Sequence, residues 1–341
     1  MLYFENDYSD GACDEVLEAL IKTNKEKLDA YGFDKYSLMA EEKIKKAANC
    51  PGAKVFFISG GTQTNKTVID SMLLKYQGVI SADTGHIAQH EAGAIESAGH
   101  KVLGLKGKNG KLCAGDVKEY VLGFYGDESH EHMVFPGMVY ISHPTEYGTL
   151  YTKRELKELY GVCKELSLPL FIDGARLGYG LVSSDSDMDL ADIAALCDVF
   201  YIGGTKVGAL CGEAVVFTRG NAPKYFMTTV KQNGAMLAKS RVLGVQFDAL
   251  FTEGVYLKIA KRAIEASDLL RGILREKGYR FFIESGTNQV FIIIDNKRLE
   301  MLKRNVRCSV WEKYDKENTV IRLATSFATT KEDVLLLAQY L

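Results

Sequence analysis

Short apolar runs alternate with amphipathic patterns through the first 245 residues, and this alternation limits the chain to few architectures. The runs are KVFFIS, VISADTG, KVLGLKG, MVYISHP, LPLFIDGA, DVFYIGG and GEAVVFT, which begin at Lys54, Val79, Lys101, Met138, Leu168, Asp198 and Gly212. Apolar residues show helical spacing over residues 15–32, 37–50, 64–76, 152–167 and 187–197. Strands that alternate with helices form βαβ units, so we predict an α/β fold with a mostly parallel sheet covered on both faces.

The character of the sequence changes near residue 245. Residues 250–278 predict a long helix, continuous or interrupted once, and residues 279–284 and 288–295 predict strands. A further strand over 319–326 and a final helix from Lys331 complete an α+β pattern. We therefore expect a large domain over residues 1–245 and a smaller C-terminal domain over 246–341. The N-terminal segment is expected to pack on the small domain or on a partner subunit.

Composition and charge exclude several classes of protein. The formal net charge is −2, and Lys and Arg are interspersed with Asp and Glu, so no basic stripe predicts binding to nucleic acid or to a membrane surface. The seven cysteines are never at C-x-x-C spacing, which favours reduced thiols over disulfides or zinc. No run approaches the ~18 apolar residues of a membrane span, and the acidic N-terminus lacks a signal-peptide pattern. We expect a cytoplasmic protein.

A glycine turn follows the first apolar run. Residues 59–65 read SGGTQTN, at a predicted junction of strand and helix. Glycine allows the backbone to approach an anion closely, and a helix N-terminus supplies unpaired N–H groups. Thr62 and Gln63 offer further donors. An ordinary strand-to-helix turn has the same pattern, so both interpretations stay open.

Two further segments place charged residues directly after apolar strands. Asp173, in DGAR, could hold a protonated ring nitrogen or cap a turn, and Arg176 could bind a carboxylate or lie on the surface. Lys206, in GGTKVGA, lies among small and apolar residues, where burial lowers a lysine pKa as a Schiff-base lysine requires. A mobile turn lysine is the alternative. The C-terminal ends of parallel strands meet at one edge, so these segments can converge.

A late arginine and a pair of histidines complete the candidate residues. Arg322 lies in an apolar strand pattern and needs a partner, either a substrate carboxylate or an internal acid. His86 and His90 are four residues apart, but no H-E-x-x-H pattern or third ligand accompanies them. We predict no metal site, and we place His90 and Glu91 in the wall of the site or at a subunit interface.

Five blocks of sequence together resemble the low-specificity L-threonine aldolases of the β-eliminating lyase group. They are SGGTQTN, GHIAQHEAGA, LPLFIDGARLGYGL, IGGTKVGAL and IRLATSFATTKEDV, and the resemblance runs from about Asn6 to the C-terminus. It implies an aspartate-aminotransferase-like fold (fold type I), pyridoxal 5'-phosphate (PLP) as cofactor and a small amino acid as substrate. It also implies retro-aldol cleavage of L-threonine or L-allo-threonine to glycine and acetaldehyde, at the interface of a homodimer or homotetramer.

The resemblance implies how the cofactor is held. Lys206 matches the lysine that forms the Schiff base, Asp173 the partner of the ring nitrogen, and His86 the histidine that stacks on the ring. The phosphate would lie against Gly61, Thr62 and Gln63.

On the substrate side, the resemblance places Arg176 near the ring oxygen and the substrate, and Arg322 and Ser9 at the substrate carboxylate. The family's Thr-His-Asn-Gly segment reads Thr145-Glu146-Tyr147-Gly148 here, so the base is His86, Glu146 or a water that they hold. The family's histidine in the late arginine block is Ser326.

The phosphate-binding arginine that the family takes from a neighbouring subunit has no clear match, and Lys239 or Arg241 is expected to replace it. Three other functions remain as alternatives to an aldolase: a β-eliminating amino-acid lyase on the same scaffold, an aminotransferase and a non-catalytic PLP-binding protein.

Overall fold

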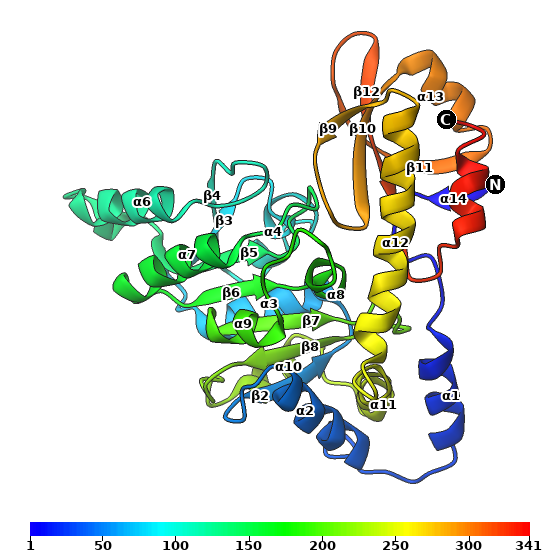
Figure 1. The fold of residues 1–341 in the computed structure, drawn as a ribbon. Coiled ribbons are helices and arrows are strands. Elements are labelled where there is room, and N and C mark those ends of the chain that lie inside the picture. The colour runs from blue at the N-terminus through cyan, green and yellow to red at the C-terminus, as the bar shows by residue number, and fades with distance from the viewer.

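The chain forms two β-sheets that one long helix connects (Figure 1). In the computed structural model, which describes all 341 residues, the larger sheet has the strand order β2-β8-β7-β6-β5-β3-β4. Its strands are Lys54–Ile58 (β2), Gln77–Ala82 (β3), Val102–Leu105 (β4), Phe135–Ser142 (β5), Leu170–Asp173 (β6), Val199–Gly203 (β7) and Glu213–Phe217 (β8). β8 runs antiparallel to both of its neighbours, and the other six strands point the same way. The predicted α/β fold with a mostly parallel sheet is confirmed.

Side chains of the large sheet alternate between two hydrophobic cores. In β6, Leu170 and Ile172 pack into one core while Phe171 packs into the other. The same alternation in β5 separates Val139 from Tyr140. Because both faces are covered, these strands are apolar at nearly every position, and this explains the continuous apolar runs in the sequence.

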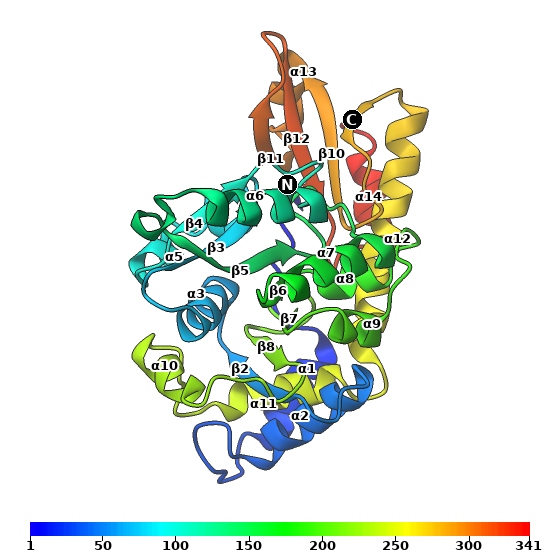
Figure 2. The same cartoon turned by 90° about the vertical axis from the view of Figure 1, so that its left-hand side faces the viewer.

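Helices cover the two faces of the large sheet, with α3, α5 and α10 on one side and α7, α8 and α9 on the other (Figure 2). The helices of this part are Asp14–Thr23 (α1), Lys35–Ala47 (α2), Gly61–Met72 (α3), His86–Gln89 (α4), Ala94–Ser97 (α5), Ala114–Gly126 (α6), Lys153–Glu165 (α7), Leu177–Leu181 (α8), Leu190–Ala195 (α9), Phe226–Gln232 (α10) and Arg241–Leu250 (α11). A 3-10 turn spans His130–His132.

The first helix is shorter than the sequence predicts. α1 ends at Thr23, whereas apolar spacing predicted a helix to residue 32. Arg241 explains the early end, because its guanidinium donates to the carbonyl oxygens of Thr23 and Glu26, at 2.6 and 2.7 Å. An arginine that binds carbonyls at the end of a helix replaces the hydrogen bonds that further helical turns would make.

The smaller sheet has the order β1-β11-β12-β10-β9 and carries its own core. Its elements are Leu2–Phe4 (β1), Val255–Glu276 (α12), Arg280–Ile283 (β9), Gln289–Asp295 (β10), Asn296–Leu302 (α13), Val306–Lys313 (β11), Asn318–Ala324 (β12) and Lys331–Leu337 (α14). β1 pairs in parallel with β11, so the N-terminus joins a sheet built almost entirely from the C-terminal end of the chain (Figure 1).

The long helix belongs to both parts of the molecule. Ile259 and Ala263 of α12 lie in the core of the large sheet, and Leu270 and Leu274 lie in the core of the small sheet. Of the two possibilities that the sequence left open, the helical region is interrupted, at residues 251–254, where Gly254 caps α12 with a φ of +71°. β11 was not predicted, because only one face of this strand is buried and its sequence is mixed in polarity.

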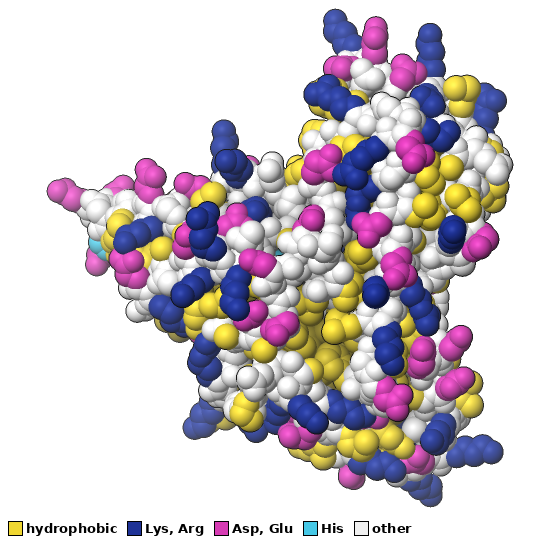
Figure 3. Space-filling model, in the orientation of Figure 1, with side chains coloured by type: hydrophobic (Ala, Val, Ile, Leu, Met, Phe, Trp, Pro, Cys, Tyr) yellow, Lys and Arg dark blue, Asp and Glu magenta, His cyan; other side chains and the backbone are white.

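The surface carries charges of both signs. Figure 3 shows acidic and basic side chains interspersed. The outline of the molecule is concave between the part that holds the small sheet and the part that holds the large sheet (Figure 3). No helix is both long enough and apolar enough to cross a membrane.

Phe171 offers a test of the packing of the large sheet. Its side chain is fully buried, so Phe171→Ala should lower the free energy of unfolding by about 3–5 kcal/mol through lost burial and a cavity. Denaturant unfolding of the cofactor-free protein, followed by far-UV circular dichroism, measures the change. The control is Val310→Ala on the exposed side of β11, which should stay within about 0.5 kcal/mol of the parent. Equal losses in the two variants would contradict this packing.

Candidate active site

A pocket of about 340 Å³ opens at the carboxyl edge of the large sheet. Parallel strands end there, and the segments that follow β2, β3, β5, β6 and β7 all contribute side chains to it. Of the residues predicted from the sequence, the pocket is lined by Gly61, Thr62, His86, Glu146, Asp173, Arg176 and Lys206. Gln63, Ser9 and Arg322 are not among its lining residues.

Lys206 follows β7 in a turn, and its amine reaches this pocket. Tyr179 fixes the backbone there by donating its hydroxyl to the Lys206 carbonyl oxygen at 2.5 Å. Burial and the nearby positive charge of Arg176 lower the pKa of Lys206, although Asp7 and Asp173 oppose the shift. A lysine with a lowered pKa has more of its amine neutral and therefore nucleophilic.

Asp173, the last residue of β6, is buried and accepts hydrogen bonds on both carboxylate oxygens. Tyr140 and Asn65 donate to Oδ2 at 2.5 and 2.9 Å, and the Tyr201 hydroxyl donates to Oδ1. Burial alone would raise the pKa of Asp173, but the charge of His86 and these hydrogen bonds lower it below its usual value. Asp173 is therefore held as a carboxylate inside the pocket.

His86 begins the short helix α4, and a buried carboxylate fixes its ring. The Nδ1 atom lies 2.7 Å from Oε1 of Glu91, whose side chain is fully buried. Asn65 donates one amide hydrogen to that same Glu91 oxygen and the other to Asp173. His86 and Asp173 are thus connected through Glu91 and Asn65. The sequence predicted Glu91 in the wall of the site or at an interface, but it did not reveal Asn65.

Glu146 replaces the histidine that the family resemblance would place at this position. Its Oε1 atom accepts hydrogen bonds from the Ser142 hydroxyl at 2.6 Å and from the His86 backbone N–H at 2.8 Å. Burial raises the pKa of Glu146, and these hydrogen bonds only partly oppose the shift. Oε2 has no protein donor, so a lining carboxyl oxygen remains available to a ligand.

The glycine turn ends at the N-terminus of α3, and no side chain caps this helix. The first N–H groups of a helix have no partner within it, so Gly61 and Thr62 present free donors to the pocket. A side chain at Gly61 would come within 3.3 Å of the Tyr201 hydroxyl. Gln63 turns away and accepts a hydrogen bond from Ser59.

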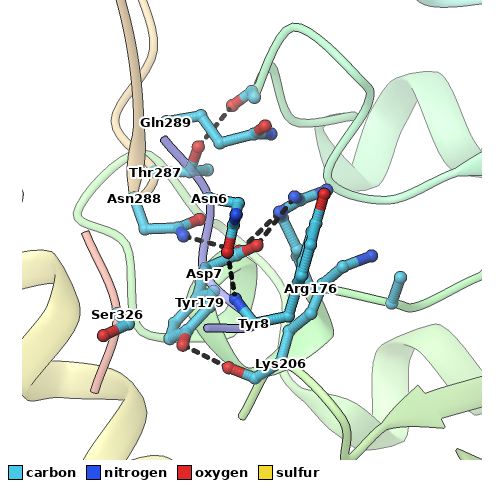
Figure 4. A network of polar contacts seen from close by, with 12 residues as sticks. Asn6, Asp7, Tyr8, Arg176, Tyr179, Lys206, Thr287, Asn288, Gln289 and Ser326 are labelled. Carbon is cyan, nitrogen blue, oxygen red and sulfur yellow. Dashed lines mark hydrogen bonds and ion pairs between the residues drawn. The ribbon is translucent and has the colours of Figure 1, made fainter. Parts of the chain in front are cut away.

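Arg176 makes a bidentate ion pair with Asp7, which the sequence did not single out. Nε and Nη2 of Arg176 lie 2.6 and 2.8 Å from the two Asp7 oxygens (Figure 4). Asn288, the residue before β10 of the small sheet, also donates to Asp7, at 2.9 Å. Burial would raise the pKa of Asp7, but Arg176 lowers it to about 2.

The N-terminal segment brings residues 7 and 8 to the site and leaves Ser9 outside it. Ser9 is exposed and donates to the Asn6 side chain. The Tyr8 ring, in contrast, lines the pocket, and its centroid lies 5.8 Å from the Lys206 amine. The only hint in the sequence was the run of polar residues after the apolar start LYF.

Arg322 lies in β12, beside the pocket, and makes no ion pair. It donates to the Gln289 side chain, the Glu5 carbonyl and the Ser309 hydroxyl, and its Nε atom is buried without an acceptor. Burial and the nearby charge of Arg176 lower the pKa of Arg322 to about 10. A buried guanidinium without a carboxylate is costly, so this arrangement favours an incoming anion.

The remaining predicted residues lie outside the pocket. His90 is exposed, with its ring centroid 6.1 Å from that of Trp311, and no group of three potential metal ligands occurs. Arg241 is engaged by the carbonyls at the end of α1, and Lys239 is exposed.

Known proteins are similar in sequence to this chain over most of its length. The profile of the beta-eliminating lyase family matches residues 7–309. A low-specificity L-threonine aldolase from a Pseudomonas species is 31% identical over 303 residues, which cover 88% of this chain and 86% of that protein. The chain belongs to the beta-eliminating lyase family.

Solved structures agree with this family assignment. The threonine aldolase of Leishmania major matches this beta-eliminating lyase with a TM-score of 0.96 and 36% identity, over 99% of this chain and 98% of that one. An aspartate aminotransferase from Thermus thermophilus matches with a TM-score of 0.71 and 14% identity, over 100% of this chain and 90% of that one, and it shows the shared fold. The expected aspartate-aminotransferase-like fold is confirmed.

Beta-eliminating lyases of this fold use PLP, and the pocket fits that cofactor. It combines the free N–H groups of Gly61 and Thr62, a carboxylate at Asp173 and a lysine amine at Lys206. These match the three chemical features of PLP, which are a phosphate, a basic ring nitrogen and an aldehyde.

The Asp7–Arg176 ion pair yields a prediction about stability and pH. Asp7→Asn should lower the free energy of unfolding by about 3 kcal/mol at pH 7, because it leaves a buried guanidinium without its counter-charge. Since the Asp7 pKa is depressed to about 2 in the folded state, its contribution is complete above pH 4 and is lost as the pH falls towards 2.

Denaturant titrations at several pH values measure both effects. The parent should lose about 2 kcal/mol more than Asp7→Asn between pH 4 and pH 2. Glu284→Gln is the control, because it breaks an exposed ion pair with Arg275 and should cost at most about 1 kcal/mol. Parallel pH curves for the parent and Asp7→Asn would contradict the assignment.

Proposed function

We propose that this lyase is a PLP-dependent aldolase that cleaves L-threonine and L-allo-threonine between Cα and Cβ, giving glycine and acetaldehyde. The observation that carries the proposal is the convergence of Lys206, Asp173 and Glu146 in one buried pocket. These residues lie in a chain whose sequence is 36% identical to that of the threonine aldolase of Leishmania major. A small amino acid is the substrate class that a pocket of about 340 Å³ can share with the cofactor.

In this proposal Lys206 binds the cofactor covalently, His86 packs against its ring, and Asp173 faces the ring nitrogen. When bound, PLP withdraws electrons from the Cα atom of an attached amino acid, so that a bond to Cα can break. The Asp173 carboxylate stabilises a proton on that nitrogen, because hydrogen bonds from Tyr140 and Asn65 hold it ionised and in place. Gly61 and Thr62 bind the phosphate through the N-terminus of α3.

Arg322 is proposed to bind the substrate carboxylate. Its buried Nε–H has no acceptor, and burial together with Arg176 lowers its pKa, although the charges of Asp7 and Glu5 oppose the shift. A carboxylate would supply that anion through charge-assisted hydrogen bonds. Arg176 is already paired with Asp7, so we propose that it orients the N-terminal segment and adds a long-range attraction to the carboxylate.

Glu146 is proposed to accept the proton of the substrate β-hydroxyl at Oε2. Oε1 is fixed by Ser142 and by the His86 backbone, so only the second oxygen faces the pocket without a protein donor. Burial raises its pKa towards the range in which a carboxylate is an effective base near neutral pH. His86 is the second candidate, but its Nδ1 is already engaged with Glu91.

We also propose that the chain functions as a homo-oligomer with at least two subunits. Tyr31, Phe33 and Leu38 are exposed around a groove of about 440 Å³ that α2, β2 and residues 220–240 line. Exposed aromatic side chains beside such a groove are typical of subunit interfaces. Lys239 is exposed and its amine makes no ion pair, whereas the Arg241 guanidinium donates to carbonyl oxygens at the end of α1, so Lys239 is the better candidate to reach a partner's phosphate site.

The activity can be tested directly with the purified protein. With PLP and L-threonine, glycine and acetaldehyde should form in equal amounts, and Lys206→Ala should abolish both because no other lysine lines the pocket. Borohydride treatment of the holoenzyme should leave a pyridoxyl group on the peptide that contains Lys206. Pyruvate and ammonia from serine as the only products would identify a β-eliminating lyase instead, and glutamate formed from 2-oxoglutarate would identify an aminotransferase.

The role of Glu146 has its own kinetic signature. Glu146→Gln should lower kcat by about 10²–10⁴-fold while PLP still binds, because the β-hydroxyl loses its base. In the parent, activity should fall on the acid side as Glu146 becomes protonated at a pKa above its usual 4.5, and this acid limb should be absent in Glu146→Gln. Ser142→Ala removes one hydrogen bond from the same carboxyl and should have a smaller effect. An unchanged acid limb in Glu146→Gln would assign the base to another group.

A further inference from the structure

Besides Glu146, a second carboxyl group without an ion pair lines the pocket, that of Glu213, and the proposed mechanism does not use it. It is the first residue of β8, which runs against the other strands of the large sheet. An antiparallel strand begins where its neighbours end, so Glu213 lies at the same carboxyl edge. It pairs with Ile58 of β2 on one side and with Gly203 of β7 on the other.

These two partners are the last residues of their strands, and each strand leads into a turn that lines the pocket. Ile58 precedes the turn to Gly61 and Thr62, and Gly203 precedes the turn to Lys206. The Glu213 side chain lines the pocket together with all of these turn residues. The register of the sheet therefore fixes a carboxyl group between the proposed phosphate site and the cofactor lysine.

The Glu213 carboxyl is held by neutral donors only. The Thr205 hydroxyl donates to Oε1 at 2.8 Å and the Gly204 N–H donates to Oε2 at 3.0 Å. The residue is 3% exposed and makes no ion pair. An ionised carboxyl withdrawn from water without a cation is costly, so this group tends to hold a proton.

The ionisable groups around Glu213 do not supply that cation at short range. Lys206 is the nearby positive charge and favours the ionised form, whereas Asp173 opposes it, and the phenols of Tyr201 and Tyr256 face it from β7 and α12. Burial outweighs the attraction of Lys206 and raises the pKa of Glu213 to about 7. Covalent attachment of the cofactor to Lys206 also changes the charge of the lysine nitrogen, and therefore its attraction for Glu213.

We propose that Glu213 is a protonated ligand of the cofactor phosphate, so that PLP binding takes up a proton at this carboxyl. The proposal rests on the proposed placement of the phosphate at Gly61 and Thr62. A carboxylate beside a phosphate dianion would repel it, whereas a protonated carboxyl donates a hydrogen bond to it. One side chain thereby couples retention of the cofactor to pH.

The test measures binding rather than catalysis. Cofactor-free parent and Glu213→Gln are titrated with PLP at pH 8 by calorimetry, in two buffers that differ in ionisation enthalpy, which gives the number of protons exchanged. The parent should take up about one proton more per PLP than Glu213→Gln. Between pH 7 and 9 the Kd of the parent should rise by up to about tenfold per pH unit relative to that of the variant. Equal proton numbers and parallel Kd curves would overturn the proposal.

Two controls assign the effect to this carboxyl and to the phosphate. Pyridoxal, which lacks the phosphate, should abolish the difference between parent and Glu213→Gln, and a difference that persists would overturn the proposal. The parent alone should also take up more protons with PLP than with pyridoxal, a comparison that holds even if the variant fails to fold. Glu146→Gln removes the other unpaired carboxyl of the pocket, and loss of the proton uptake there would also count against Glu213.

Failure of the inference is distinguishable from failure of the proposed function. If PLP does not attach to Lys206 in the parent, as borohydride labelling would reveal, both fail. If PLP attaches and supports glycine formation but Glu213→Gln takes up as many protons as the parent, only the role of Glu213 is lost.

Discussion

Three parts of the chain meet at the ion pair between Asp7 and Arg176. Asp7 comes from the N-terminal segment, Arg176 follows β6 of the large sheet, and Asn288, just before β10 of the small sheet, donates to the same carboxylate. The pair is almost wholly withdrawn from water, so its members are stable there only while they remain together. This requirement holds the N-terminal segment against the pocket and fixes Tyr8 beside Lys206.

The same constraint on buried charge shapes the rest of the pocket. Asp173 stays ionised because Tyr140, Tyr201 and Asn65 donate to it, and Glu91 stays beside it because Asn65 and His86 share its charge. The partners of these groups in hydrogen bonds are tyrosine, asparagine and histidine side chains of the same pocket. Hydrogen-bond donors and fixed partners, rather than mobile surface charges, therefore set which side chains carry a proton.

The main features of the fold and several pocket residues could be predicted because their signals are local. An apolar run followed by Gly61, Asp173 or Lys206 marks the end of a buried strand, and ends of parallel strands must share one edge. The contacts that orient these residues are not local. Asp7 and Arg176 are 169 positions apart, and nothing near Asp7 in the sequence identifies its partner. Ser9 was chosen in that segment, but the structure turns Asp7 and Tyr8 towards the pocket.

Arg322 and Glu213 are ionisable groups that are largely withdrawn from water and make no ion pair, and we relate them to the two ionic ends of the proposed ligands. Arg322, on the small sheet, is a cation with an unused Nε–H, and an amino-acid carboxylate matches it. Glu213, on the large sheet, is an acid beside free N–H groups, and in its ionised form it would repel the phosphate that those groups favour. An anion can neutralise the first, but only a proton or a cation can neutralise the second. The pocket therefore favours binding of the carboxylate outright, whereas it favours binding of the phosphate only together with a positive charge.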